Sequence, residues 1–194
     1  MADVLSYPSD IEEKPAIILD WDGTIRKPKS GEFIQDADDL EFYDGVISAL
    51  WKYKRAGYLV LGATNQGGIA YNHKTLSSFA ADVGEMKLAS SHEQGWPFDD
   101  WHFSPYMKGG EDKTYSRSSL MRKPNYGMLA LMEHRLIKEY GVAPDWDSTR
   151  TFMLGDSYND RKLASKVGIL FAQAEDWRKD IKRDNFQPKP PINS

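Results

Sequence analysis

Three short apolar runs, each followed at once by polar residues, constrain the fold of this 194-residue chain more than any other feature. They read AIIL before Asp20, YLVLGA before Thr64 and TFML before Gly155. Runs this short and this uniformly apolar are typical of strands buried on both faces of a parallel sheet. Residues 45–56 and 127–140 place apolar side chains at helical spacing, and a glycine follows each segment. Strands that alternate with helices predict an α/β fold with a Rossmann-like, doubly wound parallel sheet.

The remaining segments complete this layout. We expect further helices at residues 74–87 and 160–167 and a last strand at residues 168–172. Residues 90–121 show no clean periodicity, so we expect a long irregular loop there, of a length that is commonly functional. Because each gap between the motifs described below holds one helix or one irregular loop, no large cap domain is expected. The sequence therefore predicts a single domain over residues 1–180 and a loose, proline-containing tail over residues 181–194.

Composition and charge exclude several classes of protein. The absence of cysteine excludes disulfides, thiolate zinc sites and a cysteine nucleophile. The formal net charge of −4 gives no general attraction to a phosphate backbone, so long nucleic-acid duplexes are disfavoured as partners. No apolar run approaches the ~20 residues that a membrane span needs, and the start of the chain lacks the pattern of a secretory signal. We therefore expect a cytoplasmic enzyme with no membrane partner.

The strongest chemical signal is the pentapeptide DWDGT at residues 20–24. In extended backbone the side chains at positions i and i+2 point the same way, so Asp20 and Asp22 are expected to face one site. Gly23 allows the sharp turn that follows the strand. Two carboxylates in one pocket repel each other, which leaves one ionised and makes the other easier to protonate. Such a pair supplies a nucleophile and a general acid. The alternative is an Asx-type turn in which Asp20 satisfies loop amides.

Two weaker signals could hold a phosphate. Thr64 and Asn65 open the sequence TNQGG, where a hydroxyl and exposed backbone N–H groups can bind phosphate oxygens, although the same residues also suit a plain polar turn. Arg122 and Lys123 form a pair of adjacent cations, and Pro124 keeps Lys123 out of helical geometry. A lysine held in such a loop can act as a point charge on a phosphate. The alternative is a solvated surface pair.

A further acidic signal follows the last of the three apolar runs. Residues 155–160 read GDSYND, and the carboxylates of Asp156 and Asp160 suit a hard cation that prefers oxygen ligands. Aspartate and asparagine also cap helices well. For Asp160 in particular, helix capping and metal support are equally good interpretations.

Taken together and in this order, these signals resemble the motifs of the haloacid dehalogenase (HAD) phosphohydrolases. The resemblance covers about residues 16–172, nearly the whole chain. Within the superfamily the chain is most similar to the branch that contains heptose bisphosphate phosphatase, the histidinol-phosphate phosphatase domain and the polynucleotide 3'-phosphatase domain. The segments EFYDGVISAL, TNQGGIA and RKPNYGML resemble the heptose enzyme most. The resemblance implies a HAD-like fold and phosphatase activity.

The resemblance also implies a role for each matching residue. Asp20 attacks phosphorus and forms an aspartyl-phosphate, while Asp22 protonates the leaving alcohol and then accepts a proton from the hydrolytic water. Mg²⁺ is the expected cofactor, held by the Asp20 carboxylate, the Asp22 backbone carbonyl and Asp156. The expected phosphate- and substrate-binding residues are Thr64 and Lys123, which hold the equatorial oxygens, and Asn65 and Arg122, which orient the substrate.

The chain departs from heptose-type relatives in the loop before RKP, where those proteins bind a structural zinc through three cysteines and a histidine. The matching positions here are Ser104, Tyr106, Ser119 and Met121. None of these side chains can reproduce a thiolate site, so no zinc is expected. The loop should instead be ordered by packing of its aromatic residues, Trp96, Phe98, Trp101 and Phe103.

Three functions remain open on these grounds. The acidic charge and the heptose-type motifs favour a sugar bisphosphate or a similar small phosphomonoester as substrate. The sequence KSGEF at residues 29–33 resembles polynucleotide 3'-phosphatases, and an open site beside an aromatic loop favours the short 3' end of a nucleic acid. No Walker-type loop is present, so a joined kinase is not expected. The third possibility is an inactive member that binds a partner through its tryptophans.

Overall fold

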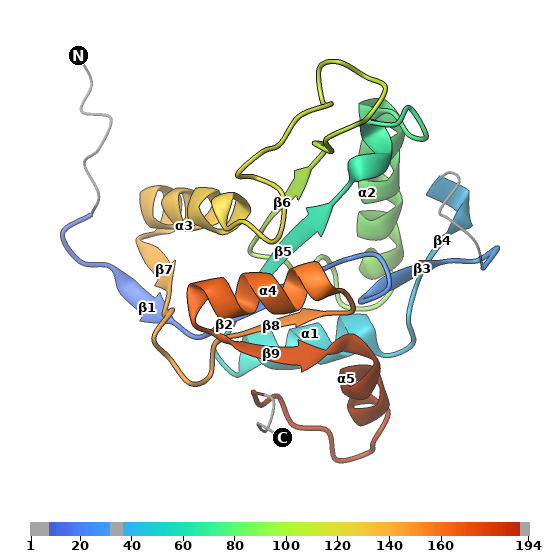
Figure 1. Ribbon diagram of the computed structural model, residues 1–194. Coiled ribbons are helices and arrows are strands. Elements are labelled where there is room, and N and C mark those ends of the chain that lie inside the picture. Colours follow the sequence, from blue (N-terminus) through green and yellow to red (C-terminus); the bar gives the residue numbers. More distant parts are fainter. Residues whose placement is uncertain (1–7, 32–36, 191–194) are drawn as a thin grey trace.

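The computed structural model describes residues 8–31 and 37–190, and Figure 1 labels the elements along the chain. The strands are β1 (Glu12–Lys14), β2 (Ala16–Leu19), β3 (Arg26–Pro28), β4 (Leu40–Phe42), β5 (Leu59–Asn65), β6 (Asp100–Ser104), β7 (Val142–Pro144), β8 (Phe152–Gly155) and β9 (Leu170–Gln173). The helices are α1 (Val46–Arg55), α2 (Leu76–Ser91), α3 (Gly127–Tyr140), α4 (Tyr158–Val167) and α5 (Ala174–Ile181), with short 3-10 turns η1 (Ala37–Asp39) and η2 (Gly67–Ile69).

A five-stranded parallel sheet forms the centre of the molecule, with the order β6-β5-β2-β8-β9. The strand β2 lies between β5 and β8, and Leu19 is in register with Gly62 on one side and Leu154 on the other. The chain builds outward from β2 in one direction and then in the other. The strand order therefore reverses between β2 and β8, and open parallel sheets bind their ligands at such a reversal.

Helices cover both faces of the sheet (Figure 1). Side chains alternate between the faces along β2, since Ile17 and Leu19 join one core cluster whereas Ala16 and Ile18 join the other. The first cluster also contains residues of α1, α2 and α5, and the second contains residues of α3 and α4. The predicted doubly wound parallel α/β sheet is thus confirmed.

The structure differs from the expected elements in the segment 90–121. A strand, β6, lies within it and extends the edge of the sheet by pairing with β5. The prediction of an irregular loop is therefore wrong for Asp100–Ser104. Only one neighbour strand pairs with β6 in the described residues, and its side chains are mostly half-buried. A half-buried edge strand does not show the uniform apolar run that marks the inner strands.

The structure also contains smaller elements that the sequence pattern did not predict. A β1–β7 pair, the β3–β4 hairpin and helix α5 were not expected. Part of the expected tail packs on the core, because Phe186 is buried with its ring 6.0 Å from that of Tyr53. Residues 191–194, like Glu32 and Phe33 of the KSGEF motif, lie outside the described residues. The single domain over residues 1–180 stays a prediction. In the part of the chain that the structure describes, no helix combines the length and apolarity needed to cross a bilayer.

Candidate active site

The predicted residues lie at the carboxyl end of the central sheet, where the strand order reverses. Asp20 directly follows β2, and its backbone N–H donates to the Leu154 carbonyl on β8 at 3.0 Å. Thr64 and Asn65 end β5, the other neighbour of β2. Asp156 directly follows β8. The parallel register of the three strands thus brings the separate motifs to one edge of the sheet.

Lys123 joins these motifs through two buried ion pairs. Its Nζ lies 2.8 Å from Asp20 Oδ1 and 2.7 Å from Asp160 Oδ1, and the lysine side chain is only 1% exposed. Burial alone would lower the pKa of Lys123, but the charges of Asp20 and Asp160 and their hydrogen bonds outweigh it and raise the pKa. The lysine is therefore held as a cation at the centre of the site.

Asn65 holds the backbone of this lysine. The Lys123 N–H donates to Asn65 Oδ1 at 3.0 Å, and Asn65 Nδ2 donates to the Lys123 carbonyl at 3.1 Å. Both ends of the side-chain amide are thus engaged with one residue. Arg122, the neighbour of Lys123, donates from Nη1 to the Tyr106 carbonyl at 3.1 Å. Its guanidinium lies against Gly67, where an added Cβ would come within 3.1 Å of Nη1.

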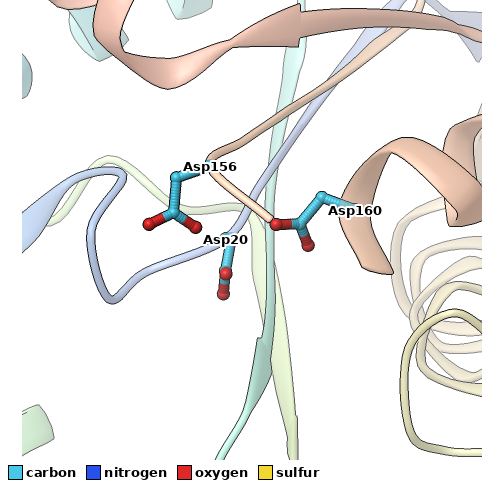
Figure 2. Close-up of side chains that lie close together, drawn as sticks. All are labelled: Asp20, Asp156 and Asp160. Carbon is cyan, nitrogen blue, oxygen red and sulfur yellow. The ribbon is translucent and has the colours of Figure 1, made fainter. Parts of the chain in front are cut away.

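Three carboxylates converge beside Lys123. Oxygen atoms of Asp20, Asp156 and Asp160 all lie within 4.8 Å of one another, and Figure 2 shows Asp20 flanked by the other two. Burial raises the pKa of Asp20 to about 7, against the opposing pull of Lys123. Burial and then the charge of Asp160 also raise the pKa of Asp156. The cluster holds more negative charge than its one lysine balances.

This donor set fits Mg²⁺. Hard divalent cations of this kind prefer carboxylate oxygens, and a cation would relieve the repulsion among the three aspartates. Asp156 is exposed, so the cluster is open to solvent on that side. Asp160 already has other partners, since its Oδ2 accepts from the Ser157 N–H at 3.1 Å and the Ser157 hydroxyl at 2.6 Å. The Asp160 N–H also donates to Ser157 Oγ at 3.3 Å. Together with the contact from the Ser157 N–H, this forms a capping box at the start of α4, so the capping interpretation of Asp160 is confirmed.

The side chain of Asp22 lies in a different environment from that of Asp20. Its Oδ1 accepts from Arg26 Nε at 2.7 Å, and its Oδ2 accepts from Gln66 Nε2 at 2.7 Å. The same Gln66 nitrogen also donates to Thr64 Oγ1 at 2.9 Å. Burial raises the pKa of Asp22, but the charge of Arg26 and the hydrogen bonds from Arg26 and Gln66 outweigh it and lower the pKa.

A second arginine holds the loop that carries both aspartates. Arg178 of α5 donates from Nη1 to the carbonyls of Gly23 and Thr24, the latter at 3.1 Å, and its guanidinium stacks 4.1 Å above the Tyr43 ring. Gly23 has a φ of 75°, and a Cβ there would come within 1.9 Å of Asp156 Oδ2. The loop after β2 therefore packs closely against the loop after β8.

The aromatic residues of the segment before Lys123 pack together, as expected, and they gather around Trp21, which was not expected. The Trp21 ring centroid lies 5.0 Å from that of Trp101, 5.9 Å from that of Phe98 and 6.3 Å from that of Trp96. Phe103 joins the same group through Phe79, at 4.5 Å. Further along, Arg117 stacks 4.4 Å from the Tyr106 ring. Aromatic packing and this stacked pair order the segment next to the site.

Sequence reasoning missed three residues of the site: Arg26, Gln66 and Arg178. Gln66 could have been found, because it stands within the same TNQ motif as Thr64. Arg26 and Arg178 carry no such signal, since isolated arginines in a sequence are mostly exposed.

Known proteins are similar to this chain over most of its length. A family model described as polynucleotide kinase 3 phosphatase matches residues 15–184. The D-glycero-beta-D-manno-heptose-1,7-bisphosphate 7-phosphatase of Photorhabdus laumondii is 32% identical over 155 residues, which cover 80% of this chain and 77% of that protein. The Haemophilus influenzae protein of the same name is 33% identical over 154 residues, covering 78% of this chain and 77% of that one.

Solved structures share the fold. A protein from Mesorhizobium loti described as HAD-like superposes with a TM-score of 0.69 at 25% identity, over 93% of each chain. A D,D-heptose 1,7-bisphosphate phosphatase from B. bronchiseptica, complexed with magnesium and phosphate, superposes with a TM-score of 0.60 at 24% identity, over 82% of this chain and 78% of that one. The fold and the site define a phosphatase of the HAD superfamily. Within that class, the chain belongs to the family described as polynucleotide kinase 3 phosphatase.

Proposed function

We propose that this chain is a Mg²⁺-dependent phosphomonoester hydrolase in which Asp20 is the nucleophile. The observation that carries the proposal is the pair of contacts made by Lys123 Nζ, 2.8 Å from Asp20 and 2.7 Å from Asp160. During attack the phosphoryl group must contact the nucleophile. A buried cation that touches the same carboxylate would therefore lie beside the phosphoryl group. A fixed charge of this kind stabilises the negative charge that develops on the transferring phosphoryl oxygens.

In this proposal Asp20 Oδ attacks phosphorus, the bond from phosphorus to the leaving oxygen breaks, and an aspartyl-phosphate forms. Asp22 protonates the leaving oxygen and then accepts a proton from the water that hydrolyses the intermediate. The free protein holds Asp22 ionised. A phosphate dianion beside it would raise its pKa as substrate binds, which is the direction a general acid needs.

Asp20, Asp156 and the backbone carbonyl of Asp22 would hold Mg²⁺ in this proposal. Bound there, the ion would favour ionised Asp20 and neutralise charge on the phosphate. Thr64 and Lys123 would bind the phosphoryl oxygens. Because both ends of the Asn65 amide hold the Lys123 backbone, we assign Asn65 to positioning that lysine. No structural zinc is proposed.

We propose a sugar bisphosphate or a similar small phosphate ester as substrate. Two features support it: relatives named as heptose bisphosphate phosphatases at 32–33% identity, and the half-buried guanidinium of Arg122 beside the loop that follows Thr64. Only one of its hydrogen-bonding groups is engaged in the described contacts, with the Tyr106 carbonyl. Arg122 would orient the part of the substrate that is not transferred. A sugar bisphosphate substrate also favours a cytoplasmic location, because such metabolites occur in the cytoplasm.

A second candidate substrate is the 3'-phosphorylated end of a short nucleic acid. The description of the matching family model favours it. So does the segment between β2 and α1, whose described residues hold the small β3–β4 hairpin and the turn η1 rather than a large cap. A site without a cap can admit a bulky substrate.

Phosphate release with Mg²⁺ tests both candidates. The panel should contain sugar bisphosphates, histidinol phosphate and a 3'-phosphorylated oligonucleotide, each with the wild-type protein and with Asp20→Asn. Release by the wild type alone would support the chemistry, and the preferred panel member would identify the substrate class. Release from no member, together with no binding of Mg²⁺, would contradict the proposal.

A further inference from the structure

Arg26 is buried beside the active site although the chemistry proposed above gives it no part. Its side chain is 0% exposed, and its Nε donates to Asp22 Oδ1 at 2.7 Å. An arginine stays charged in proteins, and a buried charge is unfavourable unless it is paired. The partner that it touches most closely is Asp22, whose own side chain remains 45% exposed at the site.

A second layer of contacts fixes the guanidinium itself. Its carbon lies 5.3 Å from the Trp21 ring centroid and 6.0 Å from that of Phe79. Its Nη1 lies 3.1 Å from Met86 Sδ and 4.0 Å from Asp82 Oδ2. Packing on aromatic rings and a charged partner behind it leave the group little freedom to move.

Asp82 is in turn anchored by a lysine. It is 0% exposed on α2, and its Oδ2 lies 2.5 Å from Lys74 Nζ. The four groups alternate in charge, in the order Asp22, Arg26, Asp82 and Lys74. The chain of contacts therefore runs from the exposed carboxylate of Asp22 to helix α2, outside the loops that carry the motifs.

We propose that Arg26 is a positioning residue that orients Asp22 for proton transfer to the leaving group. The inference rests on the proposed function. Arg26 and Gln66 each hold one of the two Asp22 oxygens at 2.7 Å, so the plane of the carboxylate is fixed from both sides. A proton donor must meet the leaving oxygen within hydrogen-bond reach. A carboxylate that can rotate would spend less time in that geometry.

A lysine cannot replace this arginine. The guanidinium is planar and donates along the axis of its Nε–H bond, whereas an ammonium group is a compact point charge at the end of a flexible stem. Arg26→Lys therefore keeps the charge but loses the orientation of Asp22. The variant separates positioning from simple charge balance.

The test compares two leaving groups. When the phosphoryl group is transferred to Asp20, an alkoxide leaving group must take a proton from Asp22 as its bond to phosphorus breaks. The leaving group 4-nitrophenolate is stable as an anion and leaves without taking a proton. The quantity to measure is kcat/KM, because it reports only the steps up to the release of the leaving group. For Arg26→Lys we expect kcat/KM to fall about 100-fold with a sugar phosphate, at the lower end of what general acid catalysis contributes. With 4-nitrophenyl phosphate it should change by less than about threefold.

Arg135→Lys is the matched control. Arg135 makes a two-pronged ion pair with Asp100, at 2.8 Å for both bonds, at the opposite end of β6 from the site. The Arg135→Lys variant loses an arginine–aspartate ion pair comparable to that of Arg26 and Asp22. Its kcat/KM for both substrates should stay unchanged. Equal losses on both substrates in Arg26→Lys would overturn the inference, because a merely structural role does not distinguish leaving groups.

Asp82→Asn covers the case in which Arg26→Lys does not fold. The variant alters the contact behind Arg26 without touching Asp22. It should therefore give a smaller loss of kcat/KM, and that loss should again be larger with the sugar phosphate than with 4-nitrophenyl phosphate. Equal losses of kcat/KM with the two substrates in a folded Asp82→Asn protein would also overturn the inference. A wild-type protein inactive on both substrates would instead contradict the proposed function, so the two failures can be told apart.

Discussion

Asp20 and Asp22 are two residues apart on one loop, yet the structure surrounds them with opposite charges. Asp20 shares one lysine with Asp160 and lies beside Asp156, so negative charge is in excess around it. Asp22 instead contacts Arg26 and Gln66, both of which donate to it. Burial raises the pKa of Asp20 to about 7, whereas burial of Asp22 is outweighed by the charge of Arg26 and the hydrogen bonds from Arg26 and Gln66, which lower its pKa.

This difference would suit two identical side chains to the separate tasks proposed for them. The excess of negative charge at Asp20 suits a cation and destabilises the site when none is bound. The donors around Asp22 hold its carboxylate in place while substrate and product exchange. Neighbouring groups, more than residue type, therefore separate the two roles.

The largest expected effect comes from removing the charge on the Asp20 side. Asp20→Asn abolishes the proposed nucleophile, and phosphate release should fall at least about a thousandfold. The measurement is release from the preferred substrate with saturating Mg²⁺. A variant that keeps a tenth of the wild-type rate would assign the nucleophile elsewhere.

Asp156→Asn should act through the cation. It removes one of the three carboxylates, so the apparent affinity for Mg²⁺ should weaken at least about tenfold, the lower end for changes around a metal ligand. Titration of activity with Mg²⁺ measures this, and an excess of Mg²⁺ should recover part of the rate. An unchanged Mg²⁺ dependence would remove Asp156 from the metal site.

The stability of the metal-free protein should rise in Asp20→Asn. The folded pKa of Asp20, about 7, lies above the ordinary value of 3.8 for an aspartate, so ionised Asp20 lowers the stability of the fold. This penalty is complete above about pH 7 and absent below about pH 4. In chelator at pH 8 the variant should melt a few degrees higher than the wild type, since 1 kcal/mol corresponds to ~2–4 °C in a chain of this size. The gap should close as the pH falls to 4.

Asp22→Asn should change stability in the opposite direction and by less. Because the folded pKa of Asp22 is lowered, its carboxylate stabilises the fold above its unfolded pKa, and this contribution is lost as the pH falls through the folded pKa. The side chain is 45% exposed, so solvent screens the pairing and the loss at pH 7 should be under about 1 kcal/mol. Thermal melts of the two variants side by side measure the sign. The same sign for both would contradict the contrast between the two aspartates.

The sequence predicted those parts of the site that lie at the ends of inner strands. Uniform apolar runs marked β2, β5 and β8, and the polar residues after them had to meet at one edge of a parallel sheet. That is why the strand pattern alone places Asp20, Thr64 and Asp156 together.

The contacts that hold these residues could not be predicted in the same way. Arg26 and Asp82 are 56 residues apart and come from a hairpin and a helix, and a charged residue in such a segment is most simply interpreted as exposed. Their burial depends on the three-dimensional packing of Trp21, Phe79 and Met86. The edge strand β6 was missed for a related reason, since partial exposure removes the apolar signal.

The contact between Arg178 and the carbonyls of Gly23 and Thr24 joins parts of the chain about 155 residues apart. During synthesis from the N-terminus, the loop that carries the proposed nucleophile leaves the ribosome about 155 residues before Arg178, which braces it. The strands β2 and β5 can pair long before that point. The sheet can therefore begin to form while the loop after β2 still lacks the hydrogen bonds that Arg178 donates to it.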